Sequence, residues 1–183
     1  TNTITLLNAA GMTFTGAANQ RLLAVHDGME YGLRTDHVGS TTASKIFLEA
    51  NRFKDGVVDF TAATTGEALG GISHFGNTTE HNTLTVKSLA AGAHSAYGGK
   101  AMGTVGGSVN NTAKVEGTGV GTLANVYGGA VTNAANAGAV TTNRVNLASG
   151  TVENIYGGAS VGSGDVTGNT VTLTGGTVTG KVY

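Results

Sequence analysis

Cysteine, proline and tryptophan are absent from the 183 residues of this chain, and charged residues make up only 11% of it. Without cysteine the chain has no disulfides, no thiolate metal ligands and no cysteine nucleophile. Without proline, and without glycine at every third position, a collagen triple helix is excluded. The formal net charge of −1 gives no electrostatic basis for binding nucleic acid. No run of about 18 apolar residues is present, so we expect no transmembrane helix in this chain.

Glycine is the most conspicuous residue that the chain does contain, with 31 copies, well above the roughly 7% of ordinary proteins. Glycine costs a helix about 1 kcal/mol per residue, and threonine and asparagine are poor helix formers. Valine and threonine that alternate with turn-forming residues favour many short strands. Hydrophobic residues still amount to 39%, enough for a folded core. Composition therefore predicts an all-β fold.

A repeat covers residues 77–183. The trio Tyr-Gly-Gly begins at Tyr97, Tyr127 and Tyr156, and the chain stops at Tyr183, giving spacings of 30, 29 and 27 residues. Units therefore end near residues 97, 127, 156 and 183. Each unit also holds a segment of the form Asn-x-apolar-x-apolar, which begins at Asn82, Asn111, Asn143 and Asn169. The alternation of apolar and polar residues is typical of strands with one buried face.

A single unit cannot fold alone, because its few inward aliphatic residues do not offset the backbone entropy of ordering nearly 30 residues. Stacked units cover one another's core, so the repeat predicts a β-solenoid. We interpret the glycine pairs as structural corners that need either a positive φ or a close backbone approach. These glycines are Gly98, Gly99, Gly128, Gly129, Gly157 and Gly158.

Residues 1–76 lack the repeat and hold 12 of the 21 charged residues and all five phenylalanines. We interpret them as irregular early coils or an N-terminal cap, since an open solenoid end exposes strand edges. Residues 3–7, 12–15 and 56–61 have strand patterns. Apolar residues at positions 43, 46, 47, 50 and 53 have helical spacing, which predicts a short helix within residues 41–53.

The repeat resembles the passenger domains of autotransporter (type V secreted) surface proteins of Gram-negative bacteria. The matching stretch is residues 166–183, Val-Thr-Gly-Asn-Thr-Val-Thr-Leu-Thr-Gly-Gly-Thr-Val-Thr-Gly-Lys-Val-Tyr, and the resemblance extends over about residues 77–183. It implies a right-handed parallel β-helix displayed outside the cell, on the bacterial surface. Adhesion or surface assembly is the role that the resemblance implies.

Two columns of side chains are the candidate functional features of the repeat. Tyr97, Tyr127, Tyr156 and Tyr183 are expected to point outward, either as an exposed aromatic ladder that binds sugar faces or as a self-stacked ladder that shields the core. The four unit-leading asparagines (Asn82, Asn111, Asn143 and Asn169) are expected to form an amide ladder from turn to turn.

The densest group of possible ligands is His26, Asp27, Glu30, Asp36 and His37. Nothing in their spacing forces them together, so we interpret them as a solvated cap loop and expect no catalytic residues, metal or cofactor. Three functions stay open. An adhesin would bind a glycan or protein of a host or neighbouring cell. A fibre subunit would pair end to end with itself through open strand edges. A polysaccharide-active enzyme is the least favoured, because the carboxylates of residues 77–183 do not share a face.

Overall fold

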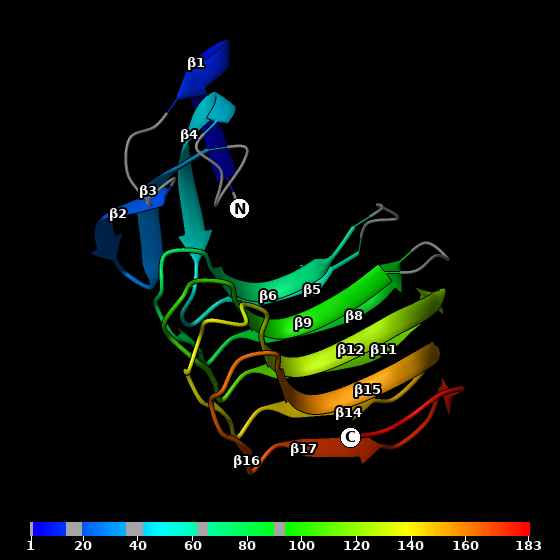
Figure 1. The fold of residues 1–183 in the computed structure, drawn as a ribbon. Coiled ribbons are helices and arrows are strands. Elements are labelled where there is room, and N and C mark those ends of the chain that lie inside the picture. Colours follow the sequence, from blue (N-terminus) through cyan, green and yellow to red (C-terminus); the bar gives the residue numbers. More distant parts are fainter. Residues whose placement is uncertain (1, 14–19, 36–41, 62–65, 90–93) are drawn as a thin grey trace.

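The structure of the protein is a computed structural model that describes residues 2–13, 20–35, 42–61, 66–89 and 94–183 (Figure 1). All regular secondary structure in these ranges is β-strand, with one antiparallel sheet followed by a stack of parallel strands. The expected all-β parallel β-helix is confirmed. In Figure 1 the antiparallel sheet stands at one end of the stack, and the C-terminus lies at the other end.

The N-terminal sheet contains β1 (Asn2–Thr13), β2 (Gln20–His26), β3 (Met29–Thr35) and β4 (Thr42–Arg52) in the order β1-β4-β3-β2. Strands β2 and β3 form a hairpin whose two-residue turn, Asp27-Gly28, has φ of 48° and 69°. Two left-handed residues at this position match the twist of the flanking strands, and Asp-Gly is a favoured pair there. We call these four strands the N-terminal sheet.

The helix expected within residues 41–53 is wrong, because the segment forms β4, which pairs with β1 on one side and β3 on the other. Its buried positions follow strand alternation, and two of them are polar: Glu49, Asn51 and Phe53 are buried. Ile46, Phe47 and Ala50, three of the apolar residues at helical spacing, are only partly buried. Backbone pairing on both edges, together with polar partners for Glu49 and Asn51, outweighs the local helical pattern.

Three parallel sheets form the solenoid, and each of four turns contributes one strand to each sheet. The short sheet contains β7 (Thr79–Glu80), β10 (Ser108–Val109), β13 (Val140–Thr141) and β16 (Val166–Thr167). The Asn sheet contains β5 (Val57–Phe60), β8 (Thr83–Leu89), β11 (Thr112–Val120), β14 (Arg144–Leu147) and β17 (Thr170–Leu173). The Tyr sheet contains β6 (Ala68–Ser73), β9 (His94–Ala101), β12 (Thr122–Val131), β15 (Thr151–Ser160) and β18 (Thr177–Val178). Strands β5 and β6 belong to a partial first turn, so the stack begins before residue 77.

The core lies between the Asn sheet and the Tyr sheet. In the middle turns the alternating apolar residues of the Asn-led strands are fully buried, as are Leu123, Val126 and Ile155 from the Tyr sheet. The expected inward positions are therefore confirmed there. In the turn that contains β17 and β18, Leu173 is 51% exposed and Val182 is 48% exposed.

A left-handed residue stands at one corner of every turn, directly before the Asn-led strand. The backbone φ there lies between 53° and 65° although the side chains differ completely: Asp55, His81, Asn110, Thr142 and Gly168. Because a left-handed residue reverses the local chain direction, it brings the following asparagine into the interior.

Candidate functional site

The asparagine ladder runs through the interior of the solenoid and is hydrogen-bonded at every step. Nδ2 of Asn82 donates to Oδ1 of Asn111 at 2.8 Å, Asn111 to Asn143 at 3.1 Å, and Asn143 to Asn169 at 3.0 Å. The same Oδ1 atoms accept the backbone N–H groups of the preceding asparagines at 2.9–3.0 Å. Each Nδ2 also donates to a backbone carbonyl of the turn before, such as that of Thr79. Three of the four side chains are fully buried, so these bonds satisfy amides that water cannot reach.

The glycine pairs make room for this ladder. Each pair lies inside a strand, and none of the six glycines has a positive φ, so they are not corners as expected. A Cβ at Gly99 or at Gly158 would lie 2.5 Å from the Cγ atom of Asn111 or Asn169 respectively. The second glycine of each pair therefore packs directly against a ladder amide. Close approach, rather than backbone conformation, is what these positions require.

The four tyrosines form a continuous face-to-face stack. Ring centroids are 4.6 Å apart between Tyr97 and Tyr127, 4.8 Å between Tyr127 and Tyr156, and 4.6 Å between Tyr156 and Tyr183. Tyr97 is only 7% exposed and Tyr183 is 59% exposed, with the two between them half-buried. Sugar recognition by aromatic residues uses ring faces, and here the faces of the inner rings cover one another. The arrangement is the self-stacked ladder, and only its last ring is open.

The N-terminal end of the tyrosine stack is closed by a buried lysine. The Lys100 ammonium lies 4.7 Å from the ring centroid of Tyr97 and pairs with Glu67 at 2.6 Å. Such a cation over a ring face is attracted by the ring quadrupole. Burial, together with the negative charge of Glu67, raises the pKa of Tyr97, so the hydroxyl stays protonated over the ordinary pH range. This end of the ladder is therefore structural.

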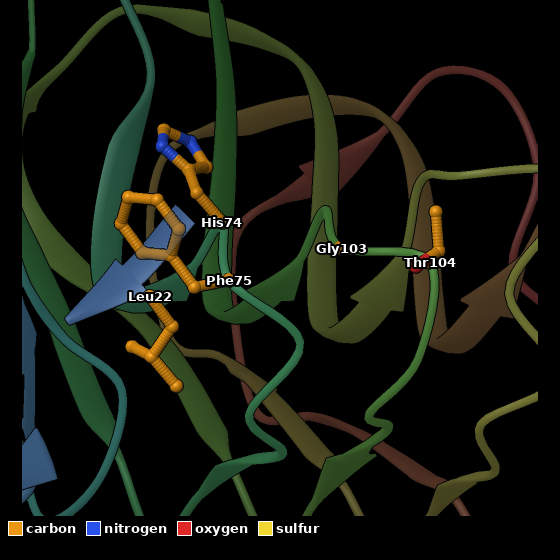
Figure 2. A pocket seen from close by; sticks show the side chains of 5 residues that line it. All are labelled: Leu22, His74, Phe75, Gly103 and Thr104. Atoms are coloured by element: carbon orange, nitrogen blue, oxygen red, sulfur yellow. The ribbon is translucent and has the colours of Figure 1, made fainter. Parts of the chain in front are cut away.

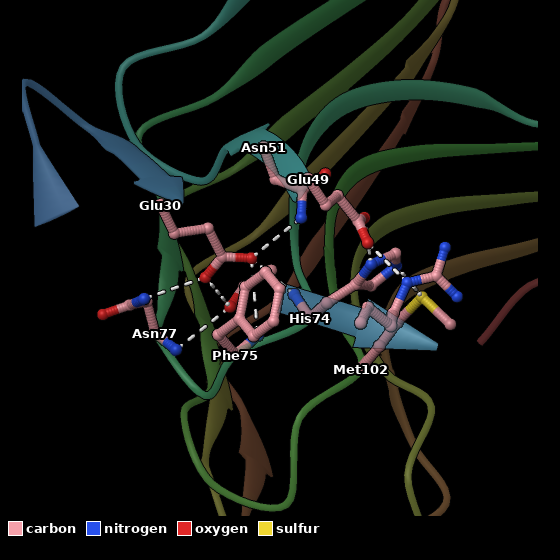
Figure 3. A network of polar contacts seen from close by, with 9 residues as sticks. Glu30, Glu49, Asn51, His74, Phe75, Asn77 and Met102 are labelled. Carbon is pink, nitrogen blue, oxygen red and sulfur yellow. Dashed lines mark hydrogen bonds and ion pairs between the residues drawn. The ribbon is translucent and has the colours of Figure 1, made fainter. Parts of the chain in front are cut away.

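A buried polar junction joins the N-terminal sheet to the solenoid (Figure 3). The Glu30 carboxylate, which is completely buried, accepts hydrogen bonds from Asn51 Nδ2 at 3.1 Å, Ser73 Oγ at 2.8 Å and Asn77 Nδ2 at 2.8 Å. Backbone N–H groups of His74 at 2.6 Å and Phe75 at 3.4 Å complete the set. Three of these five donors come from the loop after β6, and Ser73 is the last residue of β6 itself. A buried carboxylate with several donors is well satisfied, so it fixes one docking geometry.

A second buried carboxylate, Glu49, lies beside the first. It pairs with the Arg34 guanidinium and with Nδ1 of His74, whose Nε2 is 3.1 Å from the Met102 sulfur. Burial alone would raise the pKa of Glu49, but the contacts with His74 and Arg34 outweigh it and hold the pKa at about 2. Glu49 is therefore charged at neutral pH. The junction thus links β3, β4 and two solenoid loops through two carboxylates that are fully buried.

A small open cleft lies next to the junction, where the N-terminal sheet meets the solenoid loops (Figure 2). Its lining residues are Leu22, His74, Phe75, Gly103 and Thr104. Leu22 comes from β2, whereas the other four come from loops of the first two turns. The cleft is therefore formed only when the sheet is docked on the stack, and its lining is mainly polar, with apolar carbons from Leu22 and Phe75.

The five possible ligands, which we interpret from the sequence as a solvated loop, are not brought together among the described residues. His26 and Asp27 are exposed at the hairpin turn, whereas Glu30 is buried and occupied by its five donors. Asp36 and His37 lie outside the described residues. Within the described ranges no group of three or more histidine, aspartate or glutamate side chains is arranged to hold a metal ion. No described segment is a helix long and apolar enough to cross a membrane.

Sequence reasoning did not find the junction. The sequence predicts a solvated loop around Glu30 and a helix around Glu49, and no pattern in it singles out His74. The available signal was the alternation of Glu49 and Asn51 within a strand. The donors that face Glu30 are 21 to 47 residues away in the chain, which no local pattern reveals.

The geometry defines a β-solenoid carrying an antiparallel sheet at one end. Comparisons with protein-family models, with curated proteins and with solved structures find no match to this chain. Its function is therefore argued from its own residues.

Proposed function

We propose that this chain is part of an extracellular, surface-displayed β-solenoid adhesin, in which the stack is a rigid support and the N-terminal sheet with its cleft is the recognition end. The partner class is a glycan or protein of a host or neighbouring cell. The observation that carries the proposal is the buried junction, which holds the sheet in one orientation on the stack. The proposal assigns the chain no catalytic role.

Recognition needs side chains held rigidly at an accessible position. The inner rings of the tyrosine ladder and the buried asparagine ladder are both occupied by contacts within the stack. The cleft is open, and its lining combines two apolar side chains, Leu22 and Phe75, with the hydroxyl of Thr104 and the imidazole of His74. A mainly polar lining with two apolar side chains suits a sugar ring or a short polar peptide segment.

A binding screen with paired variants tests this proposal. The full chain would be applied to glycan arrays and immobilised matrix proteins. Thr104→Arg, at an exposed residue three positions after the end of β9, fills the cleft and is expected to weaken binding at least tenfold. Ala134→Arg is the matched control, because this exposed residue lies three positions after the end of β12, one turn further from the cleft. Equal binding by both variants, or no ligand in either screen, contradicts the proposal.

End-to-end assembly into fibres is a second candidate, favoured by the exposed apolar side chains of the last turn, Leu173, Val182 and Tyr183. One feature opposes it. In the ladder each asparagine donates to an asparagine Oδ1 of the next turn, but the residue at the ladder position of the first turn is Gly56, which has no Oδ1. A second copy stacked on Asn169 would therefore offer no Oδ1 to the backbone N–H of Asn169, whose Nδ2 already donates to Val140.

Light scattering across a concentration series distinguishes the two functions. Linear fibres would increase in mass without limit as concentration rises, and they would persist in the Thr104→Arg variant. The adhesin proposal expects no such growth. Electron microscopy of long filaments along the solenoid axis would establish the fibre role instead.

A further inference from the structure

His74 and Met102 place two soft electron donors against each other at the edge of the buried junction (Figure 3). Nε2 of His74 lies 3.1 Å from the Met102 sulfur. The His74 side chain is 12% exposed and Met102 is 36% exposed. The pair therefore lies where the protein interior meets the solvent, and its role is not explained by the packing of the sheet on the solenoid.

The proton on the His74 ring is placed by the contact that the other ring nitrogen makes. Nδ1 contacts the Glu49 carboxylate, which also pairs with Arg34 and, being ionised, can only accept hydrogen bonds. Nδ1 therefore carries a proton, and in the neutral imidazole Nε2 then has an unshared electron pair. A thioether sulfur is an acceptor as well. Two acceptors that face each other share no hydrogen, whereas a cation between them would bind to both.

We propose that Nε2 of His74 and the sulfur of Met102 form a binding site for a soft monovalent metal ion of the copper(I) class. Thioether sulfur selects ions of this kind, whereas magnesium and calcium prefer oxygen ligands. A histidine that binds a metal almost always donates its other ring N–H to a carboxylate, which fixes the orientation of the ring. Glu49 holds His74 in this way, so it orients Nε2 toward the ion.

The charges of the junction favour a cation at this point. The donors described for Glu30 are all neutral, and Arg34 is the guanidinium that pairs with Glu49. With a neutral His74, two carboxylates and one guanidinium leave one negative charge uncompensated. His74 contacts both carboxylates, because its backbone N–H donates to Glu30 and its Nδ1 contacts Glu49. A monovalent ion on Nε2 would therefore compensate a buried negative charge.

The backbone holds Met102 in position while its side chain can adjust. The N–H of Met102 donates to the Ser73 carbonyl at 2.8 Å, and its own carbonyl accepts from Nδ2 of Asn133 at 3.1 Å. Two metal bonds of about 2 Å each, placed in line, span more than the 3.1 Å between nitrogen and sulfur. The Met102 side chain must therefore swing outward when the ion binds, which a partly exposed and flexible thioether chain allows.

Titration of the full chain with silver(I) nitrate in a chloride-free buffer, followed by calorimetry, tests the site with a redox-stable probe for copper(I) sites. We expect one equivalent to bind with a dissociation constant below about 10 μM. Met102→Leu keeps the size of the side chain but removes the sulfur, so it should weaken binding at least tenfold. Met29→Leu on β3 is the matched control and should bind as the parent chain does. No binding in this range, full binding by Met102→Leu, or equal loss in both variants overturns the proposal.

Nuclear magnetic resonance identifies the ligands, and a competition experiment identifies the ion. The chain has three methionines, and the methyl signal that is missing in Met102→Leu is the one that silver(I) should shift. Nitrogen spectra of the His74 ring should show the proton on Nδ1 and a silver-dependent shift of Nε2. Copper(I), supplied without oxygen and buffered by a chromophoric chelator, should compete with silver(I). A proton on Nε2 at neutral pH, a shift of another methionine alone, or no competition by copper(I) overturns the proposal.

The metal site shares His74 with the cleft, but it takes an ion and its test uses no glycan or protein. It therefore does not depend on the proposed adhesin function, and either proposal can fail without the other.

Discussion

Replacing Gly99 with alanine tests the close packing of the glycine pairs against the asparagine ladder. The added Cβ would lie 2.5 Å from Cγ and Nδ2 of Asn111 and 2.8 Å from its Oδ1. The amide cannot move aside freely, because Oδ1 accepts from Asn82 and Nδ2 donates to Thr79, Ser108 and Asn143. The substitution must therefore either strain the strands or break ladder bonds.

The magnitude follows from these two routes. Overpacking a tight core costs about 1–3 kcal/mol, and a buried amide group that loses its partner costs about 1–3 kcal/mol more. We expect Gly99→Ala to lower the free energy of unfolding by about 3–4 kcal/mol. Urea denaturation followed by far-ultraviolet circular dichroism measures this change through the transition midpoint.

A double-mutant cycle shows whether the amide is the cause. Asn111→Ala removes the side chain that the new Cβ would meet, at the cost of its own hydrogen bonds. In that background Gly99→Ala should cost less than about 1 kcal/mol, because the three nearest obstacles are gone. The reasoning is refuted if Gly99→Ala costs the same in both backgrounds, or if it costs under about 1 kcal/mol in the parent chain.

Three other perturbations have definite expected results. Thr142→Gly should raise the free energy of unfolding by about 1 kcal/mol, because a β-branched residue is strained at φ 56°. Thr141→Gly, in the adjoining strand, is the control and should lower the free energy of unfolding. Glu49 has a pKa of about 2 in the folded chain, below its unfolded value near 4.5. Its contribution to the free energy of unfolding is therefore complete above pH 4.5 and is lost as the pH falls toward 2. Glu49→Gln should reduce the pH dependence of the free energy of unfolding by roughly 3 kcal/mol across that window. Tyr127→Ala removes two ring contacts and should cost about 2–4 kcal/mol, whereas Tyr127→Phe should change the denaturation midpoint little; equal losses in both would contradict stacking as the cause.

The solenoid was predictable because the sequence patterns that determine its strands and its turn length are local and repeated. Alternation after Asn111 and Asn143 identified the strands, and the spacing of 27 to 30 residues between the tyrosines identified the turn length. The same repetition indicated the ladder, since an asparagine at one position per turn comes to lie above its equivalent in the next. The sequence also suggested the need for glycine at Gly99, although it did not reveal that an amide occupies the space.

The N-terminal sheet was less predictable, because its determinants are distant in the chain. The pattern from 43 to 53 satisfies a helix, and only the pairing of β4 with two other strands makes a strand more favourable. Glu30 and Glu49 are charged residues that ordinarily lie on a surface. Their burial depends on donors brought by the loop after β6, and such partners are visible only once the sheet is docked.

The hydrogen bonds that end on an asparagine Oδ1 of the ladder all point the same way. At each step the donors belong to the earlier turn and the acceptor to the later one, as between Asn82 and Asn111. The stack therefore has a chemical direction in addition to its geometric one. A turn added in the reverse sense would set N–H groups against N–H groups. The donors and the acceptor of each repeat therefore define its orientation along the solenoid axis. Repeats of this kind can be lengthened or shortened by whole turns without any turn losing its orientation.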